Sequence, residues 1–304
     1  MLTQILTVTA PVFCIVALGY FWARWSQPFH TETLTNLVVK LATPCLVFTT
    51  LTRLHLELHT IGVMATAAAL ALALSMLIGA LVLKLSGLPQ NTYLASLMHP
   101  NTGNIGIPLV FMAFGDEGLA LGVAYFVVIS ISQYSIGYGL AAGTFSIKRL
   151  VQQPLLYAII LSLSVLVLDL PVPVWISKTT ELLSGMVIPA LLMVLGHSLA
   201  QFKVTDLRLA LYLAGVRLIM GIGIGLLLVV SLGLQGPQAG VVFLMSTMPI
   251  AVFNFVFAKH FNRSPDQVAG VIVISSLLVF FLLPVLVWIA IRIAENKFVF
   301  SVPF

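Results

Sequence analysis

The sequence predicts an all-α integral membrane protein with ten transmembrane helices, arranged as two inverted halves of five whose fourth and ninth helices are broken and cross. Of its 304 residues, 60% are hydrophobic and only 8% are charged, whereas soluble domains contain about 25% charged residues. The apolar runs are long enough to span a bilayer as helices, and they alternate too little for the strands of an outer-membrane barrel. The third observation is a faint similarity between the two halves of the chain.

The ten predicted spans follow one another through short loops that leave no room for a soluble domain. They cover residues 4–23, 31–51, 60–84, 92–114, 118–146, 154–170, 175–200, 208–232, 237–260 and 266–292. No basic residue precedes the first span and Arg24 follows it, which favours a first helix with its N-terminus outside over a cleavable signal peptide. Cys14 and Cys45 lie within spans, which argues against a disulfide framework or a metal site.

The distribution of basic residues predicts the orientation. One set of span ends carries Arg24, Lys84, Lys148, Arg149, Lys203, Arg208, Lys259 and Arg263, and the opposite set carries Arg53, Lys178, Arg292 and Lys297. The richer side is expected to be cytoplasmic, which places both termini outside in a multi-pass protein of the inner (plasma) membrane. The net charge of +5 is scattered over these loops, so we expect no nucleic-acid partner.

The fourth span contains helix breakers at its centre. Between Pro100 and Pro108, two prolines, two glycines and two asparagines occupy nine consecutive positions. Proline removes a backbone donor and glycine weakens a helix, so an unbroken helix is not expected. Freed backbone at bilayer depth is tolerated only against protein or a water-filled cavity, and broken helices near the midplane are where secondary transporters build their substrate sites.

A weak internal repeat supports two inverted halves, residues 1–147 and 148–304. The run 35–38 resembles the run 180–183 at an offset of 145, and Pro100 and Pro249 lie 149 positions apart. Five spans per half give the copies opposite orientations, so the two prolines would break helices at similar depth from opposite sides. Such breaks, crossing one another, would bring exposed backbone groups and helix ends to one point.

These segments resemble the auxin efflux carrier family, which includes plant exporters and bacterial carboxylate carriers. Pro100-Asn101-Thr102 followed by Ile105-Gly106-Ile107-Pro108-Leu109 is similar to the family's fourth helix. Val256-Phe257-Ala258-Lys259-His260-Phe261 before Pro265-Asp266 is similar to its ninth-to-tenth junction, and Gln153-Pro154 matches loosely near the sixth. The resemblance implies a crossover of helices four and nine, a scaffold of helices one, two, six and seven, transport helices three to five and eight to ten, an elevator mechanism and a homodimer. The short link between the halves favours a bacterial carrier over an auxin exporter.

The candidate substrate-binding residues of the fourth span are Pro100, Asn101, Thr102, Gly103 and Asn104. The two asparagine amides can donate to a carboxylate, or they can satisfy carbonyls freed by the prolines. The glycine is favoured for backbone geometry and close helix approach. We expect unpaired N–H groups at the start of the resuming half-helix to attract an anion without any charged side chain.

Three further candidates lie in the ninth span: Pro249, Ile250 and Asn254. Asn254 follows and precedes phenylalanines, so it is costly facing lipid. It is expected to face either the site or a neighbouring helix through hydrogen bonds.

Lysine and arginine residues within the spans are functional candidates by default, because an unpaired charge at mid-bilayer costs several kcal/mol. Lys40 is included as a source of positive potential, with snorkelling or pairing to Glu181 as the alternative. For Arg217 we expect structural pairing or snorkelling near the cytoplasmic face. His99 and His197 are expected to be structural, although a titratable histidine beside the break could couple transport to pH.

The sequence therefore predicts a secondary active transporter of small organic anions, with mono- or dicarboxylates as the expected substrates, and not an enzyme. No HExxH or GxSxG motif is present, and no cofactor or metal is expected. Spans three, four, five, eight and nine lack Asp and Glu between their ends, so a buried carboxylate pair for proton coupling is missing. The coupling ion, a proton or sodium, stays open. The alternative is a membrane sensor that binds the same anion without moving it.

Overall fold

The computed structural model describes residues 2–25, 28–53, 57–144 and 147–295. Within these ranges the regular structure is helical, apart from one isolated antiparallel bridge between Pro100 and Ile250. Seven segments are long and apolar enough to cross a membrane: Ile5–Arg24, Thr31–Arg53, Leu58–Leu85, Thr102–Ala142, Val174–Gln201, Leu207–Ser231 and Pro265–Ala294. The predicted all-helical membrane protein is confirmed, whereas the count of ten spans is not established by these lengths.

Three predicted spans do not appear as complete segments among these seven. The fourth consists of α5 (Gln90–Met98) and the beginning of the segment that resumes at Thr102, and the ninth consists of α13 (Gly236–Thr247) and α14 (Phe253–His260). The sixth is the 14-residue helix α9 (Pro154–Val167). In the fourth and ninth spans, the breaks fall where proline interrupts the backbone hydrogen bonding.

The long segment Thr102–Ala142 reverses its direction at Gly115, which has φ +64° and ψ −150° inside α6 (Ile107–Ser132). A Cβ placed on Gly122 would lie 2.6 Å from Cγ2 of Val110, although twelve residues of straight helix would separate them by about 18 Å. Glycine permits this left-handed conformation. The reversal falls at the predicted loop between the fourth and fifth spans.

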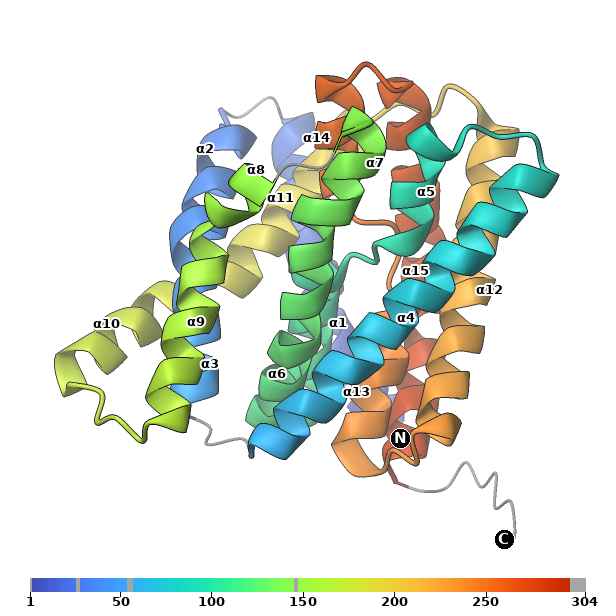
Figure 1. Ribbon diagram of the computed structural model, residues 1–304. Coiled ribbons are helices and arrows are strands. Elements are labelled where there is room, and N and C mark those ends of the chain that lie inside the picture. Colours follow the sequence, from blue (N-terminus) through green and yellow to red (C-terminus); the bar gives the residue numbers. More distant parts are fainter. Residues whose placement is uncertain (1, 26–27, 54–56, 145–146, 296–304) are drawn as a thin grey trace, which may run out of the picture.

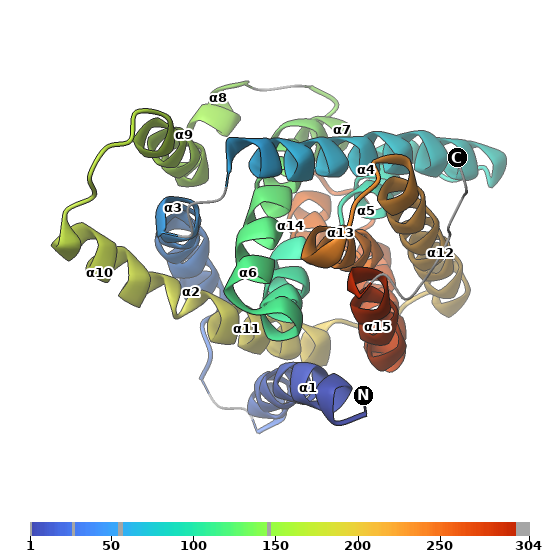
Figure 2. The same cartoon turned by 90° about the horizontal axis from the view of Figure 1, so that it is seen from below.

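The helices pack in two groups (Figure 1). Seen from below in Figure 2, one group lies along the left and lower edges, and the other fills the centre, top and right. One group comprises α1 (Leu2–Arg24), α2 (Thr31–Leu37), η1 (Val38–Ala42), α3 (Thr43–Arg53), α9, α10 (Val174–Ser184) and α11 (Val187–Gln201). The other comprises α4 (Leu58–Leu85), α5, η2 (Thr102–Gly106), α6, η3 (Gln133–Gly137), α7 (Tyr138–Ala142), α12 (Leu207–Ser231), α13, α14 and α15 (Pro265–Ala294). The short α8 (Ile147–Val151) lies between α7 and α9 in the chain.

Small residues allow the closest helix packing in the first group. A Cβ on Gly19 would lie 2.2 Å from the carbonyl oxygen of Met193, and one on Gly196 would lie 2.0 Å from that of Val16. Because lipid tails are as apolar as the side chains, the hydrophobic effect does not hold helices together within the membrane. Van der Waals packing at such close backbone contacts stabilises their association instead. The pair α1 and α11 is thus held by backbone approach, with little polar contact.

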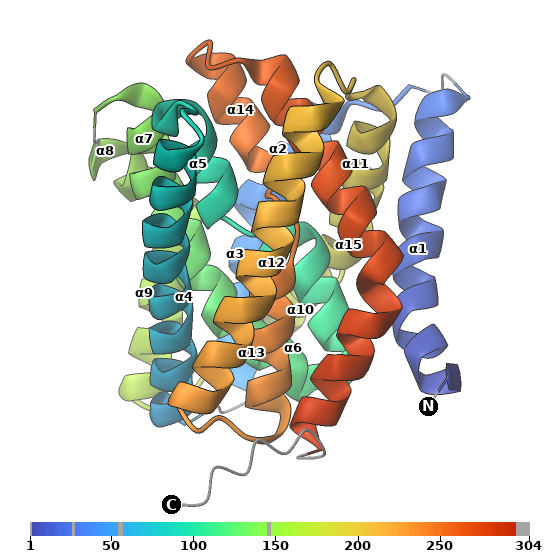
Figure 3. The same ribbon diagram turned by 90° about the vertical axis from the view of Figure 1, so that its right-hand side faces the viewer.

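The helix ends assigned to the basic side lie together on one face. The C-terminal ends of α1, α4 and α11 and the N-terminal ends of α12 and α15 gather at the top of Figures 1 and 3. The C-terminal ends of α3 and α15 lie on the opposite face. The predicted grouping of basic residues by side therefore fits the arrangement of the helices.

Candidate functional site

Two interrupted segments meet at the centre of the second group. Pro100 and Ile250 form the antiparallel bridge. The backbone N–H of Asn101 donates to the carbonyl of Pro249 (2.7 Å), and that of Ala251 donates to the carbonyl of His99 (3.1 Å). The breaks predicted at Pro100 and Pro249 are therefore present, and their extended backbones pair with one another between α5 and α13 (Figure 3).

The first segment resumes its helix through a side-chain cap. Oδ1 of Asn101 accepts from the backbone N–H of Asn104 (3.3 Å), as asparagine does at helix starts. The carbonyl of Asn101 also accepts from the N–H groups of Ile105 and Gly106, which gives the wide turn of η2. Pro108 follows within the first turn of α6, where its missing donor does no harm.

The second segment resumes without such a cap. No side chain of its own bonds the start of α14. Instead the N–H of Ile250 donates to Oγ of Ser275 on α15 (3.2 Å), and this hydroxyl donates to the carbonyl of Ile272. The ninth segment is thus supported by a neighbouring helix.

Arg217 binds the carbonyl ends of both interrupted helices. Its guanidinium donates from Nη1 to Leu97 (3.2 Å) at the end of α5, from Nη2 to Ser246 (2.8 Å) at the end of α13, and from Nε to Met248 (3.3 Å). The residue is only 2% exposed. Structural pairing is confirmed, and snorkelling to the cytoplasmic face is wrong, because the side chain turns inward to carbonyls that have no helical partner.

The sequence could not place Arg217 because its acceptors are backbone groups 29, 31 and 120 positions away. One signal was available. Arg217 is the eleventh of the 25 residues of α12, about 15 Å from its start, which is far from either end for a lysine or arginine that only snorkels.

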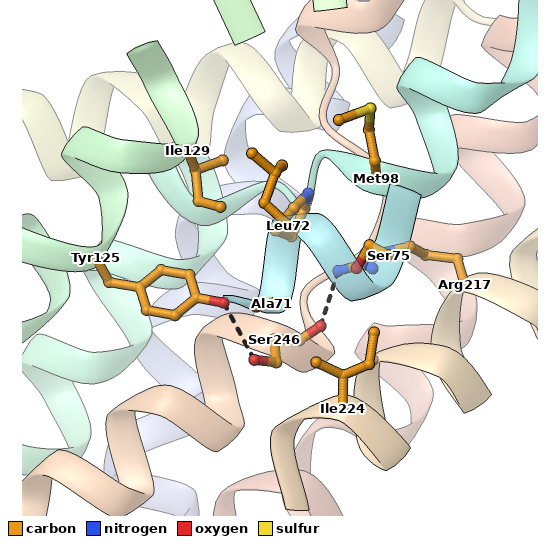
Figure 4. Close-up of a pocket in the computed structure, with 11 residues that line it drawn as sticks. Ala71, Leu72, Ser75, Met98, Tyr125, Ile129, Arg217, Ile224 and Ser246 are labelled. Atoms are coloured by element: carbon orange, nitrogen blue, oxygen red, sulfur yellow. Dashed lines mark hydrogen bonds between the residues drawn. The ribbon is translucent and has the colours of Figure 1, made fainter. Parts of the chain in front are cut away.

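A small cavity of about 10 Å³ adjoins this guanidinium. Arg217, Ser75, Tyr125 and Ser246 supply its polar lining, and the Tyr125 and Ser246 hydroxyls are hydrogen-bonded at 3.2 Å. Figure 4 shows these side chains converging from α4, α6, α12 and α13. A space of this size accommodates about one water molecule.

Two asparagine side chains at the crossing keep polar atoms without a partner. Asn101 is 4% exposed and Asn254 is 3% exposed. Nδ2 of Asn101, and both Nδ2 and Oδ1 of Asn254, have no hydrogen-bond partner. A buried amide left unpaired costs about 1–3 kcal/mol. These atoms are therefore candidates for contact with a ligand.

The expected row of free backbone donors after the first break is not found. The N–H groups of Asn101, Thr102, Asn104, Ile105 and Gly106 all bond to carbonyls or to the Asn101 side chain. At bilayer depth each donor must be satisfied by protein or water, and the crossing does this itself. The side-chain amides of Asn101 and Asn254 are left as unsatisfied donors.

The remaining candidates of the fourth segment follow Asn101 directly in the chain. Thr102 is 2% exposed, whereas Asn104 is half-buried. A Cβ on Gly103 would lie 3.0 Å from the ring of Phe126, and one on Gly106 would lie 2.6 Å from Sδ of Met245. Close approach to α6 and α13 explains these two glycines.

Lys40 lies apart from the crossing. It is exposed on η1 in the other helix group, and the described contacts do not join it to Asn101 or Asn254. Its suggested partner, Glu181, instead forms an ion pair with Arg53. Any influence of Lys40 on an anion would act through space.

Three other polar residues have structural contacts. His99 is fully buried, with Nε2 2.8 Å from Oγ of Ser132 and Nδ1 3.0 Å from the carbonyl of Ala95. Tyr134 packs edge-on against Phe253 of α14. His197 stacks on Phe29 at 4.6 Å between ring centres.

Comparison with known proteins identifies relatives along nearly the whole chain. An uncharacterized transporter of Methanocaldococcus jannaschii is 25% identical over 298 residues, covering 91% of this chain and 95% of its own length. An uncharacterized transporter of Methanothermobacter thermautotrophicus is 27% identical over 287 residues, covering 90% and 94%. The family described as membrane transport protein matches residues 4–145 and 139–289. The chain therefore belongs to this membrane transport protein family, that of the auxin efflux carriers.

Proposed function

We propose that this membrane transporter is a secondary carrier of small organic anions, most simply mono- or dicarboxylates. The observation that carries the proposal is the presence of unpartnered amides on Asn101 and Asn254 within a crossing that also buries Arg217. No carboxylate forms an ion pair with Arg217 among the described residues. The centre of the protein thus offers unpaired amide donors, which are what a carboxylate needs in a low-dielectric place.

Asn101 is assigned the main contact with substrate. Its Oδ1 is occupied by the helix cap, so its orientation is fixed with Nδ2 free to donate to a carboxylate oxygen. Asn254 contributes a second amide from the other half. Pro100, Thr102, Gly103, Asn104, Pro249 and Ile250 shape the surrounding backbone.

We also propose that the chain crosses the membrane ten times as two inverted halves, with both termini outside. The reversal at Gly115 and the paired breaks support this count, and the clustering of basic helix ends supports the orientation. A single cysteine placed at Lys148, with Cys14 and Cys45 replaced by serine, tests the orientation. It reacts with an impermeant maleimide only from the cytoplasmic side; labelling from outside contradicts the proposal.

An elevator-like movement is the proposed mechanism. The group that contains the crossing would slide against the group that contains α1, α3, α9 and α11, as the family resemblance implies. The glycine contacts between α1 and α11 make the first group a suitable rigid scaffold. A homodimer through that scaffold is part of the same proposal.

The test is counterflow of labelled malonate, malate, lactate and indole-acetate in proteoliposomes. Asn101→Ser is the decisive variant, since serine retains a cap acceptor but lacks the amide donor. We expect about a tenfold loss of affinity for the transported anion, the equivalent of one charge-assisted hydrogen bond. Unchanged transport of every anion contradicts the site assignment. Saturable binding without flux instead identifies an anion sensor.

A further inference from the structure

The position of Arg217 carries an inference about ion coupling. Three carbonyl oxygens converge on its guanidinium from two broken helices: Leu97, Ser246 and Met248. Leu97 and Ser246 are each the penultimate residue of their helices. Carbonyls at the ends of broken helices are the groups with which secondary transporters coordinate sodium.

The charge balance explains how an arginine is tolerated here without an acidic partner. A helix C-terminus is equivalent to roughly half a negative charge, so the ends of α5 and α13 together offset about one positive charge. The guanidinium supplies that charge, and its planar array of five N–H donors reaches both helix ends at once. A sodium ion in the same place would need the same carbonyl oxygens.

We infer that Arg217 is a tethered cation which occupies the cation site of the crossing and makes transport independent of sodium. It joins the ends of α5 and α13, so the two breaks move together. The adjoining cavity of about 10 Å³ has room for one water rather than for a second, hydrated cation. The part of this inference that concerns coupling rests on the proposed transport function.

Thermal unfolding of the detergent-purified protein tests the site without any substrate. For the wild type we expect the same Tm in sodium, potassium and choline chloride at equal ionic strength. Arg217→Ala is expected to lower Tm and to open the carbonyl site, so that millimolar guanidinium or sodium raises Tm again relative to choline, because a ligand that binds only the folded state stabilises it. Arg208→Ala, at the exposed start of the same helix, controls for loss of a positive charge and should show no cation response.

Two results overturn the inference: a sodium-specific rise in Tm of the wild type, or an Arg217→Ala protein whose Tm responds to no cation. If the alanine variant does not accumulate in the membrane, Arg217→Lys and Arg217→Met decide. Lysine retains a cation and methionine retains only the apolar length, so greater accumulation of the lysine variant is expected; equal amounts overturn the inference.

Counterflow then separates the two proposals. Wild-type flux of the transported anion should be equal in sodium and choline, and stimulation by sodium contradicts a filled cation site. Absence of flux for every anion, together with the expected Tm pattern, rejects the proposed function and leaves the cation assignment standing.

Discussion

The two interrupted segments satisfy the backbone groups freed at their breaks in different ways. Each ends a half-helix, passes through extended backbone and resumes, and each pairs with the other at the bridge between Pro100 and Ile250. The first resumes through its own cap, formed by Asn101, and receives one hydrogen bond from Arg217, at the carbonyl of Leu97. The second has no cap of its own and depends on Ser275 from α15, and on Arg217 from α12 for two of its carbonyls.

This difference teaches that one half of the crossing is specified by its own sequence and the other by its neighbours. A change in α12 or α15 should disturb the second segment more than a local change disturbs the first. Matched pairs of residues within the chain allow this to be tested, because adjacent or nearby positions differ in a single contact.

The largest effect is expected for Gly221→Ala in α12. A Cβ at Gly221 would lie 2.4 Å from the carbonyl oxygen of Ser246. This oxygen accepts the shortest of the three hydrogen bonds that Arg217 donates. Since this neighbour is backbone, α12 and α13 must separate, at a cost of about 3 kcal/mol, the upper end of the usual range for overpacking. We expect a lower Tm and a loss of most counterflow.

Gly223→Ala is the control for that prediction. It lies two residues further along the same helix with no heavy atom within 4 Å of a Cβ, so alanine should be neutral or slightly stabilising in an exposed helix position. Equal Tm values for the two variants would contradict the close approach of α12 to α13.

A smaller effect is expected for Ser275→Ala. The substitution leaves the buried N–H of Ile250 without its acceptor, which costs about 1–3 kcal/mol, without forcing helices apart. Ser276→Ala is the matched control, because Oγ of Ser276 is buried with no hydrogen-bond partner. Thermal unfolding of both proteins should show a decrease only for Ser275→Ala; a similar decrease for both would attribute the effect to packing.

The sequence predicted the crossing better than it predicted its support. Helix breakers at Pro100 and Pro249 are local signals, and their spacing suggested that the two segments meet. The contacts of Arg217 and Ser275 join residues 25 to 120 positions apart, and their partners are backbone groups common to every residue type. Such pairing leaves no pattern in a single sequence. The family resemblance therefore identified the motifs of the fourth and ninth spans, but not the roles of Arg217 and Ser275.

The sequence predicted which asparagines are candidates for ligand contact, but not the hydrogen bonds around them. Asn101 was identified because its amide can donate to a carboxylate, and Asn254 because asparagine is costly facing lipid; both are buried. The expected free backbone donors are mostly satisfied, because the N–H of Asn101 pairs with the other segment and those of Thr102, Asn104, Ile105 and Gly106 bond within their own. That pairing depends on the three-dimensional meeting of the halves.

The next prediction measures the local support of the first segment. Asn101→Ala removes the acceptor for the Asn104 N–H, whereas Asn101→Ser retains an N-cap oxygen, so the alanine variant should be less stable by about 1 kcal/mol. Chemical or thermal unfolding of both variants in detergent gives the difference. If the two are equally stable, Asn101 does not cap η2, and the segment is held by its partner instead.

The smallest effect is expected for Lys40→Gln, which lies outside both interrupted segments. Because Lys40 is exposed on η1, its removal should leave Tm unchanged, since no described hydrogen bond or ion pair is lost. If its charge attracts the anion through space, KM should rise by no more than about threefold at low ionic strength, and the difference should disappear at high salt because an exposed charge is screened. Arg53→Gln provides the comparison, because that side chain is also exposed but is paired with Glu181. A large loss of affinity for Lys40→Gln that persists in high salt would place the lysine in direct contact with substrate, and the crossing alone would then not account for the binding site.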